Sequence, residues 1–296
     1  MNEREKWLPW ALLIILSLIW GTSFILMKRG LEVFSAGEVG ALRLVTAGLF
    51  LLPVAIKRSK RTKGRHYRLL VIVGFIGSFI PAFLFAIAQT QIRSSMAGML
   101  NALTPFFVMI IGAWFFKLRV KLGTGLGILL GFAGALLLLF TNATDGFGTL
   151  NAYALLVVLA TILYGTNLNL IKYYLADLNA VTITSLSLVI VLPPAAVYLL
   201  GFTDFIEKLT THPDGLLATG YITILGVMST SLALILFNKL VQMTTPVFTS
   251  SVTYLIPVVA IVWGLFDGES LLMIHFIGMA VIISGVYLIN YFKNTP

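Results

Sequence analysis

The sequence of 296 residues contains no cysteine. This absence excludes disulfide bonds and thiolate metal sites. Charged residues are also scarce, at 10% of the chain, whereas a soluble domain carries about 25%. Hydrophobic residues make up 59% of the sequence, and the mean hydropathy is +1.00. We therefore expect most of the chain to be solvated by lipid.

Acidic and imidazole groups are missing from the middle of the hydrophobic segments. No Asp or Glu lies there, and the three histidines are scattered, with only His275 inside a hydrophobic run. Intramembrane proton relays usually use such groups, and an enzyme would need them gathered at one membrane face. A Walker-type phosphate loop is absent as well. The sequence thus predicts no catalytic residues, no metal and no other cofactor, and it favours facilitated diffusion or exchange over proton coupling.

Long apolar runs recur along the whole chain, separated by short polar breaks. A run of about 20 apolar residues crosses the hydrocarbon core as a helix, whereas a barrel strand needs only about 10. Ten such runs fit the sequence and leave almost nothing for a soluble domain. The predicted spans are 7–27, 37–56, 69–89, 95–116, 122–141, 150–171, 180–200, 216–237, 246–266 and 272–292. We expect an all-α integral membrane protein with ten transmembrane helices.

Basic residues accumulate in alternate loops. If the N-terminus is cytoplasmic, the inner segments hold 15 Lys and Arg residues and the outer segments hold 4, with the densest cluster from Lys57 to Arg68. Cytoplasmic loops carry such an excess and lie beside anionic lipid head groups. The formal charge of +9 therefore indicates a lipid partner and no nucleic acid. Both termini are expected in the cytoplasm of a bacterium, with the chain in its inner membrane and the first run retained as a helix.

Short motifs recur in the same order in the two halves of the chain. Trp20-Gly21-Thr22 matches Tyr164-Gly165-Thr166 at a separation of 144 residues, and Leu103-Thr104-Pro105 matches Leu255-Ile256-Pro257 at a separation of 152. This self-similarity predicts two homologous five-helix units, residues 1–145 and 146–296. Because five is odd, the second unit must be inserted upside down. Inverted repeats place a substrate site near the bilayer midplane between the units.

Several of these motifs resemble a known family. They are Trp20-Gly21-Thr22-Ser23, Arg43-Leu44-x-x-Ala47, the stretches 101–105 and 252–257, and Asp267-Gly268-Glu269. In this order they resemble the EamA family of the drug/metabolite transporter superfamily over essentially the whole chain. One departure is Lys117-Leu118-Arg119, where the first half would carry its own Gly-Glu pair. The resemblance implies that spans 1–4 and 6–9 surround a central cavity and that spans 5 and 10 are peripheral.

Polar and aromatic residues within the inner spans are candidates for the cavity wall. Uncharged groups of this kind suit amide, hydroxyl or zwitterionic substrates, although each could instead form an interhelical hydrogen bond of about 0.6 kcal/mol. The candidates are Trp20, Thr22, Phe83, Asn101, Thr104, Tyr164, Asn167, Thr230, Ser231, Ser251, Thr253 and Tyr254.

Arg43 is the one basic residue well inside a predicted span. A charge at this depth is costly and needs a partner or a wet cavity. The resemblance favours a framework role for Arg43. An ion pair with Glu38, snorkelling toward the outer face, and an anchor for an anionic substrate are the alternatives.

Two glycines and two prolines are predicted to take part in gating. Gly21 and Gly165 fall near opposite ends of the pathway if the repeat is inverted, and a glycine lets helices approach closely when one side shuts. Pro105 and Pro257 each remove a helix hydrogen bond and so weaken the fourth and ninth spans at equivalent places.

These features together predict an alternating-access exporter of small organic solutes, such as amino acids or related metabolites, acting by facilitated diffusion or exchange. The alternatives are a multidrug or lipid-carrier translocase, a proton-coupled antiporter, a channel and an integral-membrane enzyme. The expected partners are a small-molecule substrate and the lipid bilayer. No feature of the sequence indicates an oligomeric state.

Overall fold

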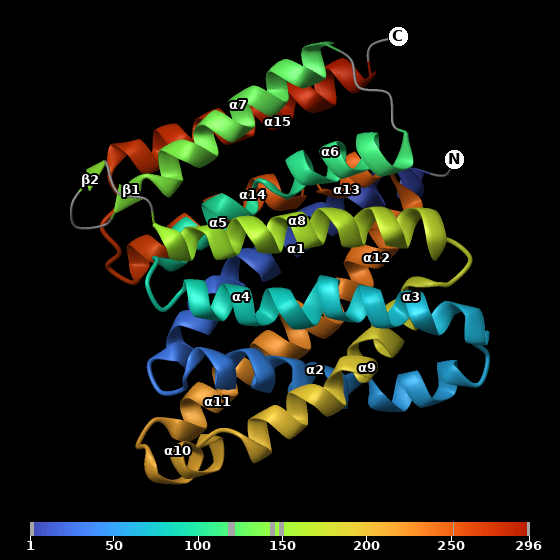
Figure 1. The fold of residues 1–296 in the computed structure, drawn as a ribbon, viewed down its shortest axis with the longest axis vertical. Coiled ribbons are helices and arrows are strands. Elements are labelled where there is room, and N and C mark those ends of the chain that lie inside the picture. The colour runs from blue at the N-terminus through green and yellow to red at the C-terminus, as the bar shows by residue number, and fades with distance from the viewer. Residues whose placement is uncertain (1–2, 118–121, 143–145, 148–150, 251, 295–296) are drawn as a thin grey trace.

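A computed structural model describes residues 3–117, 122–142, 146–147, 151–250 and 252–294. Helices make up nearly all of the described chain (Figure 1). The first half contains α1 (Glu3–Leu31), α2 (Ala36–Ser59), α3 (Gly64–Gly74), η1 (Phe75–Phe79), α4 (Ile80–Ala88), α5 (Ser94–Asn101), α6 (Thr104–Phe116) and α7 (Leu122–Leu139). The second half contains α8 (Ala152–Tyr174), α9 (Ala180–Gly201), α10 (Phe205–Thr211), α11 (Gly215–Ile224), η2 (Leu225–Leu232), α12 (Ala233–Met243), α13 (Pro246–Ser250), α14 (Val252–Phe266) and α15 (Met273–Asn294).

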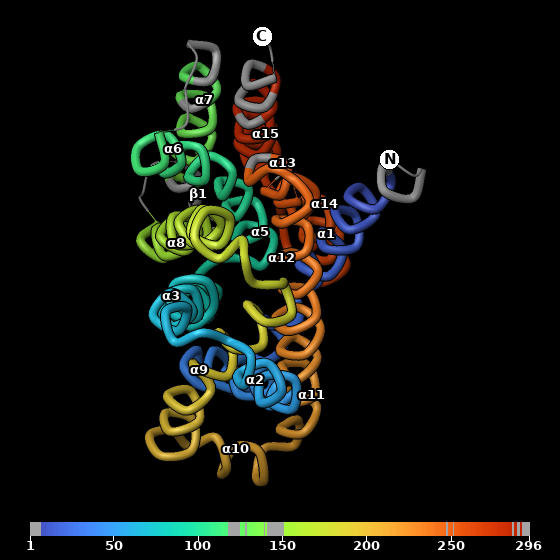
Figure 2. Tube along the Cα trace, turned by 90° about the vertical axis from the view of Figure 1, so that its right-hand side faces the viewer, coloured from blue at the N-terminus to red at the C-terminus, as the bar shows by residue number. Residues whose placement is uncertain are grey.

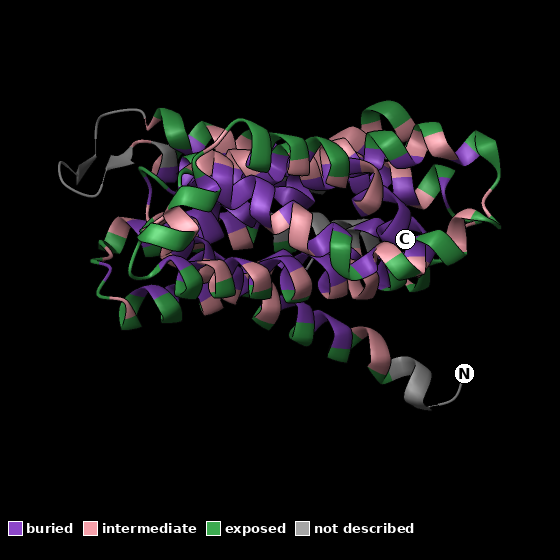
Figure 3. Cartoon of the chain, turned by 90° about the horizontal axis from the view of Figure 1, so that it is seen from below, coloured by how far each residue is buried: buried purple, intermediate pink, exposed green. Residues whose placement is uncertain are grey.

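Eight helical stretches of the described chain are long and apolar enough to cross a membrane. They are Trp7–Leu31, Ala36–Ser59, Gly64–Ala88, Ser94–Phe116, Ala152–Tyr174, Ala180–Gly201, Gly215–Met243 and Phe248–Phe266. Two shorter apolar segments, Gly125–Leu138 and Met273–Gly285, lie within α7 and α15. Figure 3 shows buried residues along the middle of the bundle and exposed residues on its outside. Large apolar side chains such as Phe266, which is 84% exposed, cover that outer surface. The prediction of a helical, multi-pass membrane protein is confirmed.

The long helices run side by side, so the bundle has two ends (Figure 1). Both termini and the turn between α2 and α3 lie at one end, which we call the terminal end. The short helix α10 lies at the other, the α10 end, as does the hairpin of β1 (Thr141–Asn142) and β2 (Gly146–Phe147). The all-α prediction is confirmed for nearly all of the described chain, but the sequence predicted neither this short hairpin nor the helix α10, because both are too short to produce a sequence period.

Equivalent caps begin the second helix of each half. Ser35 caps α2: its Oγ accepts a hydrogen bond from the Glu38 backbone N–H at 3.3 Å, and the Glu38 carboxylate accepts one from the Ser35 N–H at 2.7 Å. Asn179 caps α9 by accepting from the Thr182 N–H at 2.8 Å. Such caps satisfy backbone donors that the first helical turn leaves free. They fix where α2 begins, and with it the depth of the residues that follow.

Three of the predicted spans are interrupted. The span predicted at 95–116 divides into α5 and α6, and Pro105 occupies the first turn of α6, where a missing N–H costs nothing. The third and eighth spans contain the π-helical segments η1 and η2, which the sequence did not predict. Each π turn widens the helix by one residue, a feature common at functional sites. The two segments occupy equivalent places, because adding 152 to the residue numbers of η1 falls within η2.

Helices α7 and α15 pack against each other at one edge of the molecule (Figures 1 and 2). A Cβ on Gly134 would lie 2.7 Å from the carbonyl oxygen of Gly278, and one on Gly285 would lie 2.5 Å from the backbone nitrogen of Gly131. Small residues at such contacts let helix backbones approach closely. The two helices thus pack mainly on each other, as the family resemblance implies for spans 5 and 10.

Candidate functional site

A cavity with about 890 Å³ of empty space, including its opening, lies where the two halves meet. Trp20 of α1 and Tyr164 of α8 line it, and so do Ser23 and Asn167, one turn further along the same helices. Within each pair the two residues are 144 positions apart. The further equivalent pairs on the wall are Phe24 with Leu168, Gly77 with Ser229, Ser78 with Thr230, Phe85 with Phe237, and Asn101 with Thr253. Both halves therefore contribute matching positions to one chamber.

The structure places many of the predicted wall residues on this cavity. They are Trp20, Asn101, Thr104, Tyr164, Asn167, Thr230 and Thr253. Thr22 instead accepts a hydrogen bond from the Trp263 indole at 3.0 Å, and Ser231 donates one to the Ala47 carbonyl at 3.0 Å. Phe83 packs against Phe79, and Tyr254 is not on the cavity wall. Ser251 lies outside the described residues.

The sequence-based selection omitted several wall residues. Gly77 and Ser78 belong to η1, and Ser229 belongs to η2. The others are Ser23, Phe24, Met27, Phe85, Leu168, Leu234, Phe237 and Ser250. The internal repeat would have found Ser23 and Ser78, because their equivalents in the second half, Asn167 and Thr230, were among the candidates.

Arg43 also lines the cavity. Its Nε donates a hydrogen bond to Oγ1 of Thr230 at 2.7 Å. Glu38 does not form the ion pair with Arg43 that was considered, because its carboxylate binds Lys208 at 2.7 Å at the α10 end. No carboxylate of the described residues lies within 4.0 Å of a side-chain nitrogen of Arg43.

The contact between Arg43 and Thr230 depends on a close approach of η2 to α2. A Cβ on Gly226 would lie 2.7 Å from the backbone oxygen of Arg43 and 2.0 Å from Oγ1 of Thr46, so only glycine fits there. The hydroxyl of Thr230 donates to the Leu225 carbonyl, five residues earlier, at 3.3 Å. The π-helical turn thereby leaves the lone pairs of that hydroxyl free to accept from Arg43.

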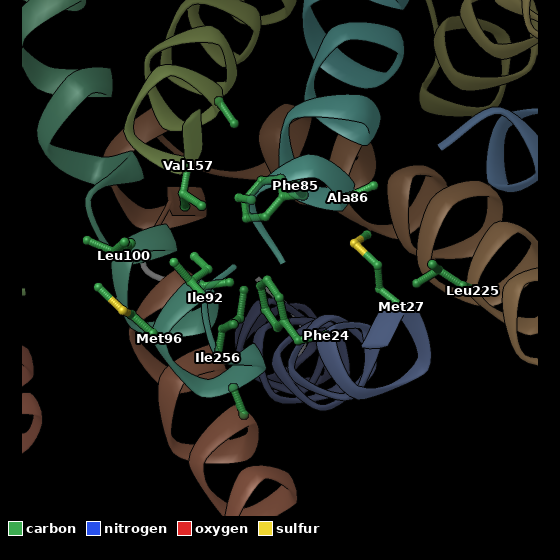
Figure 4. Close-up of a cluster of buried hydrophobic side chains, with 14 of the residues drawn as sticks. Phe24, Met27, Phe85, Ala86, Ile92, Met96, Leu100, Val157, Leu225 and Ile256 are labelled. Atoms are coloured by element: carbon green, nitrogen blue, oxygen red, sulfur yellow. The ribbon is translucent and has the colours of Figure 1, made fainter. Parts of the chain in front are cut away.

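An apolar layer of Phe24, Met27, Phe85, Ile92 and Leu225 lies next to the cavity, toward the α10 end (Figure 4). The rings of Phe24 and Phe85 lie side by side in this layer, with their centroids 5.8 Å apart and their planes tilted by 57°. All five side chains are buried.

A polar network around Glu269 lies at the same end. The carboxylate accepts hydrogen bonds from the N–H and Oγ of Ser94 at 3.0 and 2.6 Å, and Ser95 supplies two more. Lys28 lies 3.2 Å from Glu269 and also pairs with Asp267, which binds Arg29 as well. Burial alone would raise the pKa of Glu269, but the hydrogen bonds from Ser94 and Ser95 and the charge of Lys28 outweigh it and lower this pKa.

The turn that carries these two acids depends on a glycine. Gly268 has a φ of 75°, a left-handed conformation that side chains with a Cβ rarely adopt. The turn brings Asp267 and Glu269, from the second half, onto α1 and α5 of the first half. The two halves are thus held together at the α10 end by charge-assisted hydrogen bonds.

Different contacts hold the terminal end. Lys172, the equivalent of Lys28, donates to the carbonyl oxygens of Val241 and Thr244 at 2.9 and 2.6 Å. Asp177 accepts from Arg65 and lies 2.9 Å from Nε2 of His66. Burial alone would raise the pKa of Asp177, but the hydrogen bonds with His66 and Arg65 outweigh it and lower this pKa. The contacts at the two ends therefore differ in chemistry.

The predicted gating residues lie at equivalent helix contacts. A Cβ on Gly21 would lie 2.4 Å from Cβ of Val259 in α14, and one on Gly165 would lie 2.9 Å from the backbone carbon of Phe107 in α6. Phe107 and Val259 are themselves 152 residues apart. Pro105 begins α6, whereas Pro257 lies inside α14. Their role in gating remains a prediction.

No group of three or more His, Asp or Glu residues that could hold a metal ion occurs among the described residues. The described residues of the chamber wall supply hydroxyls, amides, aromatic rings and one guanidinium. A multi-pass helical membrane protein with such a chamber between two equivalent halves has the architecture of a membrane transporter.

Comparison with known families agrees with this class. The model of the EamA-like transporter family matches residues 8–140 and, a second time, residues 151–291. The chain belongs to this family of drug/metabolite transporters, and it is a membrane transporter.

Several known proteins resemble the chain over nearly its full length. The uncharacterized inner membrane transporter YedA of Escherichia coli K12 is 25% identical over 99% of this chain and 94% of its own. An uncharacterized transporter of Archaeoglobus fulgidus is 24% identical, covering 96% of this chain and 98% of its own. A solved crystal structure with 17% identity aligns with a TM-score of 0.65 over 96% of both chains, which shows a shared fold.

Proposed function

We propose that this protein is an alternating-access transporter of the bacterial inner membrane that exports small organic solutes. Amino acids or related metabolites are the proposed cargo, moved by facilitated diffusion or exchange. The observation that carries the proposal is the cavity wall, where equivalent positions of the two halves face one chamber. A chamber between equivalent halves opens to either side when the two halves exchange their conformations.

The proposed architecture is ten transmembrane helices in two inverted repeats, residues 1–145 and 146–296. The two separate matches of the family model support this division. Helix α1 runs from the terminal end toward the α10 end, and its equivalent α8 runs the opposite way (Figure 1). The packing is also equivalent, since α1 packs on α14 through Gly21 as α8 packs on α6 through Gly165.

We assign the terminal end to the cytoplasm. The basic stretch from Lys57 to Arg68 lies there, between α2 and α3. Acidic residues such as Glu38, Asp267 and Glu269 gather at the α10 end. Basic residues determine topology and collect on the cytoplasmic side. With this orientation, the apolar layer around Phe24 and Phe85 and the Glu269 network together form a closed gate between the cavity and the outer side of the membrane.

The chemistry of the wall supports a carrier without proton coupling. The described residues that line the cavity include no Asp, Glu or His, the groups on which intramembrane proton relays depend. A substrate-for-substrate exchange or a downhill flux needs no such group. The alternative is a proton-coupled antiporter, and the transport assay distinguishes the two by whether flux requires a proton gradient.

Counterflow into liposomes tests the proposal. The purified protein is reconstituted into liposomes that are loaded with one unlabelled solute, and uptake of the labelled form of that solute is measured. The panel of solutes consists of amino acids, nucleosides and organic acids. We expect transient accumulation of at least one solute without an ion gradient, and no accumulation in protein-free liposomes. Flux that requires a proton gradient would contradict facilitated diffusion or exchange. The absence of flux for every member of the panel would contradict the proposed cargo.

A further inference from the structure

The cavity holds a cation that no carboxylate of the described residues neutralises. Arg43 is the one Lys or Arg residue among the described residues that line the cavity. No carboxylate of the described residues pairs with it, and its single hydrogen bond uses Nε. The two terminal nitrogens, Nη1 and Nη2, have no hydrogen-bond partner in the described chain. An uncompensated charge within a membrane is costly, so a ligand that neutralises it gains that energy.

The guanidinium is held in one orientation. Oγ1 of Thr230 accepts from Nε, and the π-helical turn of η2 and the close approach at Gly226 position Thr230. With Nε occupied, the edge that remains is the parallel pair of N–H groups on Nη1 and Nη2. This edge matches the two oxygens of a carboxylate in a bidentate arrangement.

The rest of the wall determines the remainder of the ligand. Asn167 is 7% exposed, and its Oδ1 has no hydrogen-bond partner among the described residues. It offers an amide to a hydroxyl or amide of a substrate. Trp20, Phe85 and Phe237 provide aromatic surface for an apolar body. The described wall has no carboxylate for an ammonium group, so a cationic or zwitterionic ligand leaves one of its charges unpaired.

We propose that this transporter carries organic monocarboxylates, anions without an ammonium group, and that Arg43 binds their carboxylate through Nη1 and Nη2. This inference rests on the proposed transport function. Within the proposed cargo it keeps the related metabolites that carry one carboxylate and excludes amino acids. One guanidinium neutralises one negative charge, so the bound complex is neutral overall. A paired charge is held in the low-dielectric interior at a lower cost than an unpaired one. Arg43 is thus a substrate-binding residue, and Thr230 positions it.

Binding to the purified wild-type protein tests the substrate class without any variant. Titration calorimetry compares phenylacetate, phenylacetamide and phenylalanine, which share one aromatic body and differ in charge, and a set of aliphatic monocarboxylates accompanies them. We expect at least one monocarboxylate to bind, and phenylacetate to bind at least tenfold more tightly than its amide and its amino acid counterpart. Equal or tighter binding of the neutral or zwitterionic compound overturns the proposal, and so does the failure of every monocarboxylate to bind.

Variants test the assigned residues. We expect Arg43→Gln to weaken binding of the preferred carboxylate at least tenfold, about 1.4 kcal/mol. Arg43→Lys should retain part of the affinity, and Thr230→Val should lose less than Arg43→Gln. Arg61→Gln, which removes an exposed charge near the terminal end, is the matched control and should bind as the wild type does. Unchanged affinity in folded Arg43→Gln overturns the assignment.

The two proposals fail in different ways. Counterflow of amino acids with no monocarboxylate binding would retain the transporter and overturn the substrate class. Tight carboxylate binding without counterflow of any solute of the panel would overturn the proposed cargo and its exchange, and would leave the anion site standing.

Discussion

Glu269 and Ser94 are 175 positions apart in the sequence, yet the Glu269 carboxylate accepts two hydrogen bonds from Ser94, one from its backbone N–H at 3.0 Å and one from its hydroxyl at 2.6 Å. The carboxylate belongs to the turn after α14, and the serine begins α5. The first turn of a helix has free N–H donors and a positive dipole end, both of which favour an anion. One residue of the second half therefore caps a helix of the first half at the α10 end.

Neutralising this residue should weaken the α10 end. Glu269→Gln keeps the shape of the side chain but loses its charge and part of its accepting capacity. Because the side chain is 3% exposed, the unmatched donors of Ser94 and Ser95 stay buried, at a cost of about 1–3 kcal/mol. We expect a lower Tm in detergent and faster labelling of an engineered cysteine at Met27. Glu32→Gln is the control, since Glu32 is half exposed and, among the described residues, pairs with Arg29 alone. Equal Tm values for both variants would contradict the role of the network.

The same carboxylate should make stability depend on pH. The folded state lowers the pKa of Glu269, and a group of this kind contributes stability that is complete above its ordinary pKa of about 4.3. That contribution is lost as the pH falls through the lower pKa of the folded state. We expect the Tm difference between the wild type and Glu269→Gln to be constant from pH 7 to about pH 5 and to shrink below that. A Tm difference that grows as the pH falls would mean that folding raises the pKa of Glu269, and it would contradict this prediction.

Much of the fold was predictable because lipid imposes a local pattern. A span needs about 20 apolar residues in a row, and each such run is visible without knowing its neighbours. The break between α5 and α6 had a local cause as well, because Pro105 is visible in the sequence. The equivalence of Gly21 with Gly165, and of Trp20 with Tyr164, was predicted from the internal repeat alone.

The rest depends on contacts between distant segments. The π turn of η2 accompanies the packing of Gly226 on the backbone of Arg43, and that of η1 accompanies the packing of Gly77 on Asn167. Neither contact produces a local composition or period. For the same reason the sequence did not identify the partner of Arg43. Glu38 is nearer in sequence, but the hydroxyl of Thr230, 187 positions away, accepts the hydrogen bond.

The equivalent glycines should both be sensitive to an added side chain. In Gly165→Val the new atoms would meet the backbone of Phe107, and in Gly21→Val they would meet Val259. Neither neighbour moves without shifting its helix. We expect each variant to reduce the counterflow rate at least tenfold and to change the labelling of engineered cysteines on one side of the membrane only, with opposite sides affected in the two variants.

Glycine positions with free space around them provide the control for this pair. A Cβ on Gly201 or Gly220 would meet nothing within 4 Å. Gly201→Val and Gly220→Val should therefore transport at close to the wild-type rate. Unchanged transport and labelling in both Gly21→Val and Gly165→Val would refute the gating role of these two contacts.

Two indoles provide a matched comparison of the cavity and the periphery. Trp20 lines the cavity, and its Nε1 donates to the Ser229 carbonyl in η2 at 2.8 Å, while Nε1 of Trp263 donates to the Thr22 hydroxyl on an exposed face. Trp20→Phe removes the bond that ties α1 to η2 across the halves, and Trp263→Phe removes a bond of similar length outside the chamber. We expect the first variant to raise the counterflow KM several-fold and the second to leave it within twofold of the wild type. Equal effects of the two substitutions would mean that the cavity position of Trp20 has no special role in transport.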